Sequence, residues 1–315
     1  MKGLFSFFIH SRRAGTLAGL FLLGALLSFF SPYFLTASNL LNVMEQTSIN
    51  AVIAVGMTFV ILSAGIDLSV GSLVALSGVV MASRLQADWP LPLAVFAGLA
   101  TSAFCGLLSG LLITRGKLPP FIATLGMMSV ARGAALLFTD GRPISGFSEA
   151  LRWLSTGRLL GVPVPVPLTI LLYLVSVVAL NRTRFGRYVY AIGGNEEATR
   201  LSGVAVGFHK TLVYVLSGTT AGLASVLLTA RLNSAQPIAG MSYELDAIAA
   251  VVIGGTSLTG GAGTLGGTLI GALTMGVLRN GLNLLGISSF MQQIVIGMVI
   301  IVAVLVDSLV KSKRT

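Results

Sequence analysis

Charged residues are scarce in this chain of 315 residues, because Asp, Glu, Lys and Arg together make up only 10% of it. A soluble domain carries roughly a quarter charged residues, so this composition excludes an ordinary soluble globular protein. Hydrophobic residues make up 55% of the chain, and the mean hydropathy is +0.93. The sequence therefore predicts an integral membrane protein.

Cysteine occurs once, at Cys105 within an apolar run, which leaves no basis for a disulfide framework or a cysteine-based metal site. The two histidines, His10 and His209, lie far apart, and no nucleophile motif accompanies them. No stretch matches the phosphate-binding pattern GxxxxGK[ST], because the Gly116-Lys117 pair is followed by leucine and lacks the upstream glycine. We expect no enzyme, and no catalytic, cofactor or metal site in this chain.

Long apolar runs dominate what is present. A spanning helix needs about 20 mostly apolar residues, whereas the strands of a membrane barrel are about ten residues of alternating polarity. The runs fit the first pattern, so an all-α fold with about ten transmembrane helices is expected. The predicted spans are residues 14–30, 46–63, 69–83, 91–114, 121–139, 165–181, 211–230, 244–256, 264–284 and 289–309.

Basic residues are unevenly distributed between the loops, and the net charge is +10. Cytoplasmic loops of membrane proteins carry an excess of Lys and Arg. With a cytoplasmic amino terminus and ten crossings, the inner side collects Lys2, Arg12, Arg13, Arg115, Lys117, Arg182, Arg184, Arg187, Arg200, Lys210, Lys311, Lys313 and Arg314. The outer side collects only Arg84, Arg142, Arg152, Arg158 and Arg231. The charge thus indicates a multi-pass membrane protein with both termini cytoplasmic, without a nucleic-acid partner. Residues 1–315 are expected to form a single transmembrane domain.

Two glycine-rich breaks interrupt the apolar runs, at 65–72 and 254–267, and the surrounding segments 56–80 and 250–273 repeat the order of apolar run, break and apolar run. One interpretation is tight helix packing, which glycine permits. The other is that interrupted helices line a solute path, because irregular backbone at membrane depth survives only against protein or water. Gly254 and Gly255 are candidate residues of such a path.

Two charges lie in apolar surroundings. Asp67 is expected to cap a helix that begins near Ser69, or to take a direct part in solute passage or gating. Arg132 lies in the middle of a predicted span, where an ion pair or a substrate contact are the alternatives; its expected acidic partners are Asp67, Glu45 or Asp246. Asp67, Ser69 and Arg132, with the two glycines, are the candidate residues of a translocation path or gate.

Residues 182–210 form the longest polar segment predicted inside the cell. Asn195 can cap a short helix here, Glu196 and Glu197 fall in its first turn where carboxylates suit the helix dipole, and Gly203 can end it. The segment is either a solvated connector or a protruding element that docks into a partner subunit.

Three stretches together carry a resemblance to a known family. They are GMTFVIL and GIDLSVGS at 56–62 and 65–72, GGNEEATRLSG at 193–203, and YELDAIAAVVIGGTSL at 243–258. With further matches at 230–237 and 280–286, the chain resembles the permease subunits of bacterial ABC sugar importers over nearly its whole length, most nearly those that carry ribose.

The resemblance implies an ABC importer permease fold in the lipid of the bacterial inner membrane and a set of partners. These are a second permease copy, forming a homodimer or heterodimer, cytoplasmic ATPase subunits and a periplasmic sugar-binding protein. It also implies that 193–203 is the coupling helix, with ATPase contacts at Asn195, Glu196, Ala198, Arg200 and Leu201. Thr199 departs from the alanine that is frequent in this motif, which bears on the detailed fit.

The function expected from this resemblance is the translocation path of an ATP-driven importer of ribose or a related monosaccharide. Its alternative is an ion-coupled secondary transporter of a small polar solute, in which Asp67 and Arg132 would be the coupling groups.

Overall fold

The computed structural model describes residues 12–312, and within that range it contains thirteen helices and four strands of two residues each. The predicted all-α class is confirmed, because the strands only pair loop segments. Of the residues named above, Lys2, His10, Lys313 and Arg314 lie outside the described residues.

Five helices in the described part are long and apolar enough to cross a membrane, so ten crossing helices are not confirmed. They are α3 (Ala37–Leu62), α5 (Leu91–Thr114), α6 (Pro120–Thr139), α8 (Pro165–Arg182) and α11 (Val206–Leu232). Shorter apolar stretches occur in α2 (Arg12–Phe30), α4 (Val70–Gln86) and α14 (Ser289–Ser312). The predicted spans 244–256 and 264–284 correspond to α12 (Tyr243–Ile253) and α13 (Leu265–Leu284).

Local capping explains where several helices differ from their predicted bounds. α3 starts at Ala37, well before the predicted 46, because the Thr36 hydroxyl accepts the N–H of Asn39 and caps it. α13 begins after Thr264, whose hydroxyl accepts the N–H of Gly267 in the same way. α5 and α6 carry proline in their first turn, where the missing N–H removes no helical hydrogen bond.

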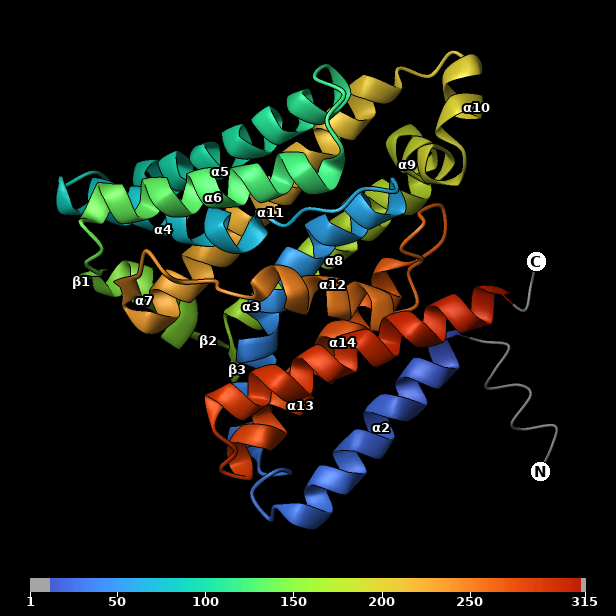
Figure 1. The fold of residues 1–315 in the computed structure, drawn as a ribbon. Helices are drawn as coiled ribbons and strands as arrows, with labels where there is room; N and C mark the ends of the chain where they lie inside the picture. Colours follow the sequence, from blue (N-terminus) through green and yellow to red (C-terminus); the bar gives the residue numbers. More distant parts are fainter. Residues whose placement is uncertain (1–11, 313–315) are drawn as a thin grey trace, which may run out of the picture.

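Short elements occupy the two ends of the long helices (Figure 1). At one end lie α9 (Arg184–Gly194) and α10 (Glu196–Leu201), and α11 leads away from them. At the other end, α7 (Glu149–Thr156) packs against α11. Near α7, β1 (Ile144–Ser145) pairs antiparallel with β4 (Ser234–Ala235), and β2 (Arg158–Leu159) pairs with β3 (Val162–Pro163).

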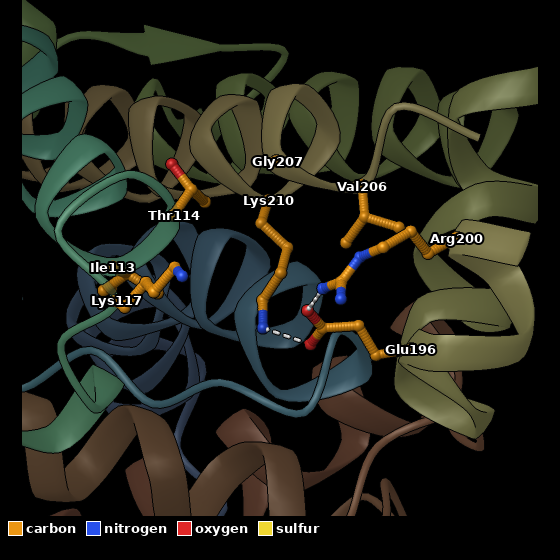
Figure 2. Close-up of a pocket in the computed structure, with 8 residues that line it drawn as sticks. All are labelled: Ile113, Thr114, Lys117, Glu196, Arg200, Val206, Gly207 and Lys210. Atoms are coloured by element: carbon orange, nitrogen blue, oxygen red, sulfur yellow. Dashed lines mark hydrogen bonds and ion pairs between the residues drawn. The ribbon is translucent and has the colours of Figure 1, made fainter. Parts of the chain in front are cut away.

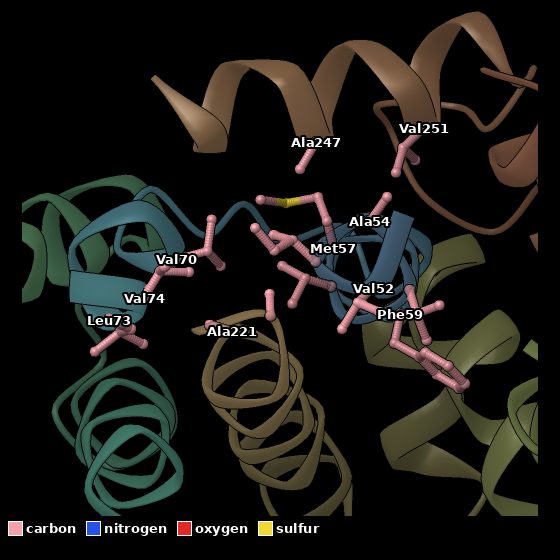
Figure 3. Close-up of a cluster of buried hydrophobic side chains, with 14 of the residues drawn as sticks. Val52, Ala54, Met57, Phe59, Val70, Leu73, Val74, Ala221, Ala247 and Val251 are labelled. Atoms are coloured by element: carbon pink, nitrogen blue, oxygen red, sulfur yellow. The ribbon is translucent and has the colours of Figure 1, made fainter. Parts of the chain in front are cut away.

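α3 is the central helix of the fold. Its side chains from Ala51 to Leu62 are all buried, as expected of a helix that is apolar on every face. Figure 3 shows α3 residues between α4, α11 and α12, where Met57 lies near Ala247 and Ala221. By contrast, large apolar side chains are exposed on α2, α5, α6, α8 and α14, which suits helices that face lipid. The interrupted helices α4 and α12 therefore belong to the interior of the fold.

Candidate translocation path and coupling site

The two glycine-rich breaks predicted from the sequence are present, and the second touches the end of the helix that precedes the first. The first joins α3 to α4, and the second joins α12 to α13. The N–H of Gly261 in the second break donates to the carbonyl oxygen of Leu62, the last residue of α3, at 3.0 Å. The repeated order of helix, break and helix thus brings two segments about 200 residues apart in sequence into backbone contact.

The carboxyl end of α9 packs onto this junction. A Cβ at Gly193 would overlap the Leu62 carbonyl oxygen and the Gly261 nitrogen, so only glycine fits there. Next to it, the Tyr190 hydroxyl donates to the carbonyl oxygen of Gly263 at 2.8 Å. α9 therefore contacts the end of α3 and the second break at the same place. α9 is an amphipathic helix that the sequence analysis did not separate from the polar segment 182–210.

The short helix predicted after Asn195 is α10. The Asn195 side chain caps it by accepting the N–H of Ala198 at 2.9 Å, and Gly203 follows with a φ of 82°. Thr199 is buried, and its hydroxyl donates to the Asn195 carbonyl oxygen at 2.8 Å. The outward side of α10 leaves Leu201 80% exposed, so an apolar side chain projects from the end of this helix.

Charged side chains tie α10 to α11 across a cavity of about 580 Å³ (Figure 2). Glu196 accepts from Arg200 at 2.9 Å through one carboxylate oxygen and from Lys210 at 2.8 Å through the other. Arg200 also donates to Glu197 at 2.9 Å. The Lys210 side chain is mostly buried, whereas the other three are exposed or half-exposed. The Glu196–Lys210 pair therefore holds the coupling candidate against α11.

Asp67 is buried and makes three hydrogen bonds. One carboxylate oxygen accepts the N–H and the hydroxyl of Ser69 at 2.9 and 2.6 Å, and the other accepts the hydroxyl of Ser217 on α11 at 2.7 Å. The capping prediction was right about the Ser69 amide, but no side chain caps the first turn of α4. Ser217 lies 150 residues from Asp67 in the sequence, so the sequence analysis missed it. Through this hydrogen bond, Asp67 connects the first break to α11.

Arg132 does not pair with any of the three acids predicted for it. One terminal nitrogen of its guanidinium donates to the carbonyl oxygens of Pro237 and Ala239, at 2.7 and 2.8 Å. These carbonyls lie in the irregular segment 236–242 before α12, where helix formation does not satisfy them. Two of the predicted acids bind other arginines instead: Glu45 lies 3.4 Å from Arg231, and Asp246 lies 2.6 Å from Arg279.

The Asp246–Arg279 pair joins α12 to α13, and Asp246 is only 1% exposed. The sequence contained a signal for it, because the predicted span 244–256 holds two acids and the next predicted span holds Arg279, and opposite charges within a membrane tend to pair.

A polar cavity of about 300 Å³ opens between α4, α6 and the start of α12. Among the five predicted path residues, Arg132 lines it, whereas Asp67 and Ser69 are buried elsewhere. Gly254 packs against the backbone of Gly267, and Gly255 follows it in a turn with a φ of 86°. The residues that line the cavity are Ser72, Met128, Ser129, Arg132, Met241, Ser242 and Glu244.

Interrupted helices, a cavity with charged lining residues and an exposed end helix fit a transport protein, and sequence comparison gives the family. Residues 39–304 match the family described as branched-chain amino acid transport system / permease component, so the chain belongs to this family of membrane permeases.

The relatives cover almost the whole chain. It is 52% identical over 297 residues to the ribose import permease protein RbsC of Escherichia coli (strain K12), covering 93% of this chain and 92% of the relative. It is 50% identical to RbsC of Bacillus subtilis (strain 168), covering 94% and 92%. Identity to the D-allose transport system permease protein AlsC of Escherichia coli is 40%, covering 98% and 95%. No solved structure matches this chain.

Proposed function

We propose that this chain is the transmembrane permease subunit of an ATP-driven importer of ribose or a related monosaccharide. The observation that carries the proposal is the identity of 50–52% to ribose import permeases from two distant bacteria, over more than nine-tenths of each chain. The family description refers to branched-chain amino acids, but the relatives described above are named for ribose and allose. The sugar assignment therefore follows the higher similarity.

In this function the chain needs an ATPase subunit on the cytoplasmic side, a periplasmic sugar-binding protein and a second permease copy. The whole of 1–315 acts as one domain in the inner membrane, with both termini cytoplasmic. α10 is the coupling helix, and its proposed ATPase contacts are Asn195, Glu196, Ala198, Arg200 and Leu201. The capped start and exposed end of α10 support this role.

Two contacts from the α9–α10 region connect the coupling helix to the interior. Through α9, Gly193 packs against Leu62 and Gly261, so a displacement of α9 acts on the end of α3 and on the second break. Through the Glu196–Lys210 pair, α10 is joined to α11, which holds Asp67 by Ser217. ATP-driven movement of the partner can thereby shift the fold between inward- and outward-open arrangements.

The ion-coupled alternative is not favoured. Asp67 is already satisfied by Ser69 and Ser217, and Arg132 is anchored by main-chain carbonyls. Both groups thus have structural partners that do not depend on a transported ion.

Reconstitution in liposomes tests the proposal. The permease alone should not accumulate ribose, whereas adding the ATPase, the loaded binding protein and ATP should produce uptake. Accumulation driven by a proton or sodium gradient without these partners would overturn the ATP-driven assignment. Uptake of leucine rather than ribose by the complete system would overturn the sugar assignment.

A further inference from the structure

The polar cavity between α4, α6 and α12 has a composition that is unusual for the interior of a membrane. Arg132 lies near the middle of α6 and is only half-buried, and Glu244 in the first turn of α12 is half-buried on the same cavity. Charged side chains at membrane depth are costly in lipid and face a bundle interior or a water-filled space. The cavity is therefore a place where water or a polar solute meets the protein.

The cavity carries opposite charges in equal number. Arg132 supplies one cation, Glu244 supplies one anion, and the remaining lining residues are neutral. A balanced site of this kind favours a neutral ligand over an ion. Its volume of about 300 Å³ is at the lower end of the range of roughly 300–1,000 Å³ for small-molecule pockets, which suits a compact solute.

The hydrogen-bonding groups match hydroxyl-bearing solutes. A guanidinium only donates, an ionised carboxylate only accepts, and a serine hydroxyl does both. The cavity offers all three kinds, with the hydroxyls coming from Ser72 on α4, Ser129 on α6 and Ser242 before α12. Met128 and Met241 add flexible apolar surface, which can cover the carbon-bound hydrogens of a sugar ring.

Arg132 is held in place without using all its donors. The carbonyl oxygens of Pro237 and Ala239 both accept from the same terminal nitrogen, and a guanidinium has five N–H donors in total. The guanidinium is thus oriented by the protein backbone, and its attachment does not require a bound solute. Such an anchored donor lowers the entropy lost when a hydroxyl binds.

We propose that this cavity is a binding subsite for a neutral polyhydroxyl solute, a monosaccharide, during its passage through the membrane. Arg132, Glu244 and Ser129 are the groups that contact the sugar hydroxyls, and Asp67 is a structural residue outside the subsite. The inference rests on the proposed function and adds to it the place where the sugar is held.

Cysteine labelling in the reconstituted complex tests the subsite. Cys105 is the only cysteine in the sequence, so a Cys105→Ala background allows single cysteines to be placed at will. Ser129→Cys lines the cavity, and Val130→Cys on the same helix is the matched control, because Val130 is 65% exposed and does not line it. Labelling by a water-soluble thiosulfonate is measured with and without ribose, in the presence of binding protein, ATPase and ATP.

The expected result is that Ser129→Cys reacts and that ribose slows its labelling severalfold, while Val130→Cys, which faces the lipid side of α6, does not react with or without ribose. Met128→Cys, at the neighbouring cavity position, should behave like Ser129→Cys, and it replaces Ser129→Cys in the experiment if that variant does not fold. Labelling of both cavity cysteines that is unaffected by ribose, in a complex that imports ribose, would overturn the subsite and leave the proposed function standing. Loss of ribose uptake in the wild-type complex itself would overturn the proposed function.

Discussion

Gly193 and Leu62 meet at the point where the coupling region touches the interrupted helices. The α carbon of Gly193 lies so close that an added Cβ would overlap the carbonyl oxygen of Leu62. The same carbonyl oxygen accepts the N–H of Gly261 at 3.0 Å. Three segments distant in the sequence, the ends of α3 and α9 and the second break, are therefore in backbone contact.

Gly193→Ala should disrupt this contact, and Gly194→Ala is the matched control. Alanine favours a helix over glycine by up to about 1 kcal/mol, so α9 itself should tolerate both changes. At Gly193 the new methyl group overlaps backbone atoms, whereas at Gly194 it meets nothing within 4 Å. Ribose uptake by the reconstituted complex should fall strongly for Gly193→Ala and stay near wild type for Gly194→Ala. Equal uptake by the two variants would contradict the role of the junction.

Local signals predicted some of this site, and tertiary contacts determined the rest. The α10 helix followed from Asn195 and Gly203, because a cap and a terminating glycine act on their own neighbours in the sequence. The partners of Asp67 and Arg132 did not follow, because Ser217 and the 236–242 carbonyls are brought to them only by the packing of α11 and α12. The sequence therefore shows which charged side chains need a partner in the apolar interior, but it does not show which residue is that partner.

The count of spanning helices shows the same limit. The apolar windows predicted ten, yet α12 has only 11 residues and α4 has 17. Both are shorter than the roughly 20 residues that a span requires. The first break precedes α4 and the second follows α12, so each helix has one end inside the fold. Glycine-rich segments were correctly identified as breaks, but the sequence did not show how far each helix extends beyond them.

Leu201→Asp tests the coupling helix. Leu201 is 80% exposed at the end of α10, so the substitution should change permease stability by less than about 0.5 kcal/mol. Burial of a leucine in a partner contributes about 1.5–3 kcal/mol, so ATPase affinity should fall about tenfold or more. The amount of ATPase that co-purifies with the permease measures this effect.

Leu160→Asp is the control for that variant. Leu160 is fully exposed in the turn between β2 and β3, at the end of the molecule opposite α10. Its φ of 51° is one that aspartate adopts more readily than leucine. ATPase binding should be unchanged for Leu160→Asp; a similar loss for both variants would assign the effect to surface charge in general, not to the coupling helix.

Asp67→Asn and Asp67→Leu separate a structural carboxylate from an ion-coupling one. Asparagine keeps an oxygen for Ser69 and offers an amide to the Ser217 hydroxyl, which can also accept. This variant should stay folded and should import ribose. Leucine leaves buried donors of Ser69 and Ser217 unsatisfied, at about 1–3 kcal/mol each, and should lower the thermal midpoint of the purified permease. A folded Asp67→Asn variant without any transport would instead favour a coupling role for the charge.

The buried pair between Asp246 and Arg279 should behave as a unit that ties α12 to α13. Arg279 donates to both carboxylate oxygens of Asp246, at 2.8 and 2.6 Å, and Asp246 is 1% exposed. Arg279→Met leaves this carboxylate buried without its cation, which costs about 3–5 kcal/mol for pairs of this kind. The double variant Asp246→Leu with Arg279→Met removes both charges and should recover most of that loss, because no uncompensated charge remains.

Thermal unfolding of the wild type, the two single variants and the double variant gives the coupling free energy of the pair. As a control, Arg200→Met removes the cation from the exposed pairs with Glu196 and Glu197, and such surface pairs contribute only about 0–1 kcal/mol each. Stability should therefore fall far more for Arg279→Met than for Arg200→Met. Additive effects of the single Asp246 and Arg279 substitutions, with no recovery in the double variant, would show that the two side chains act independently.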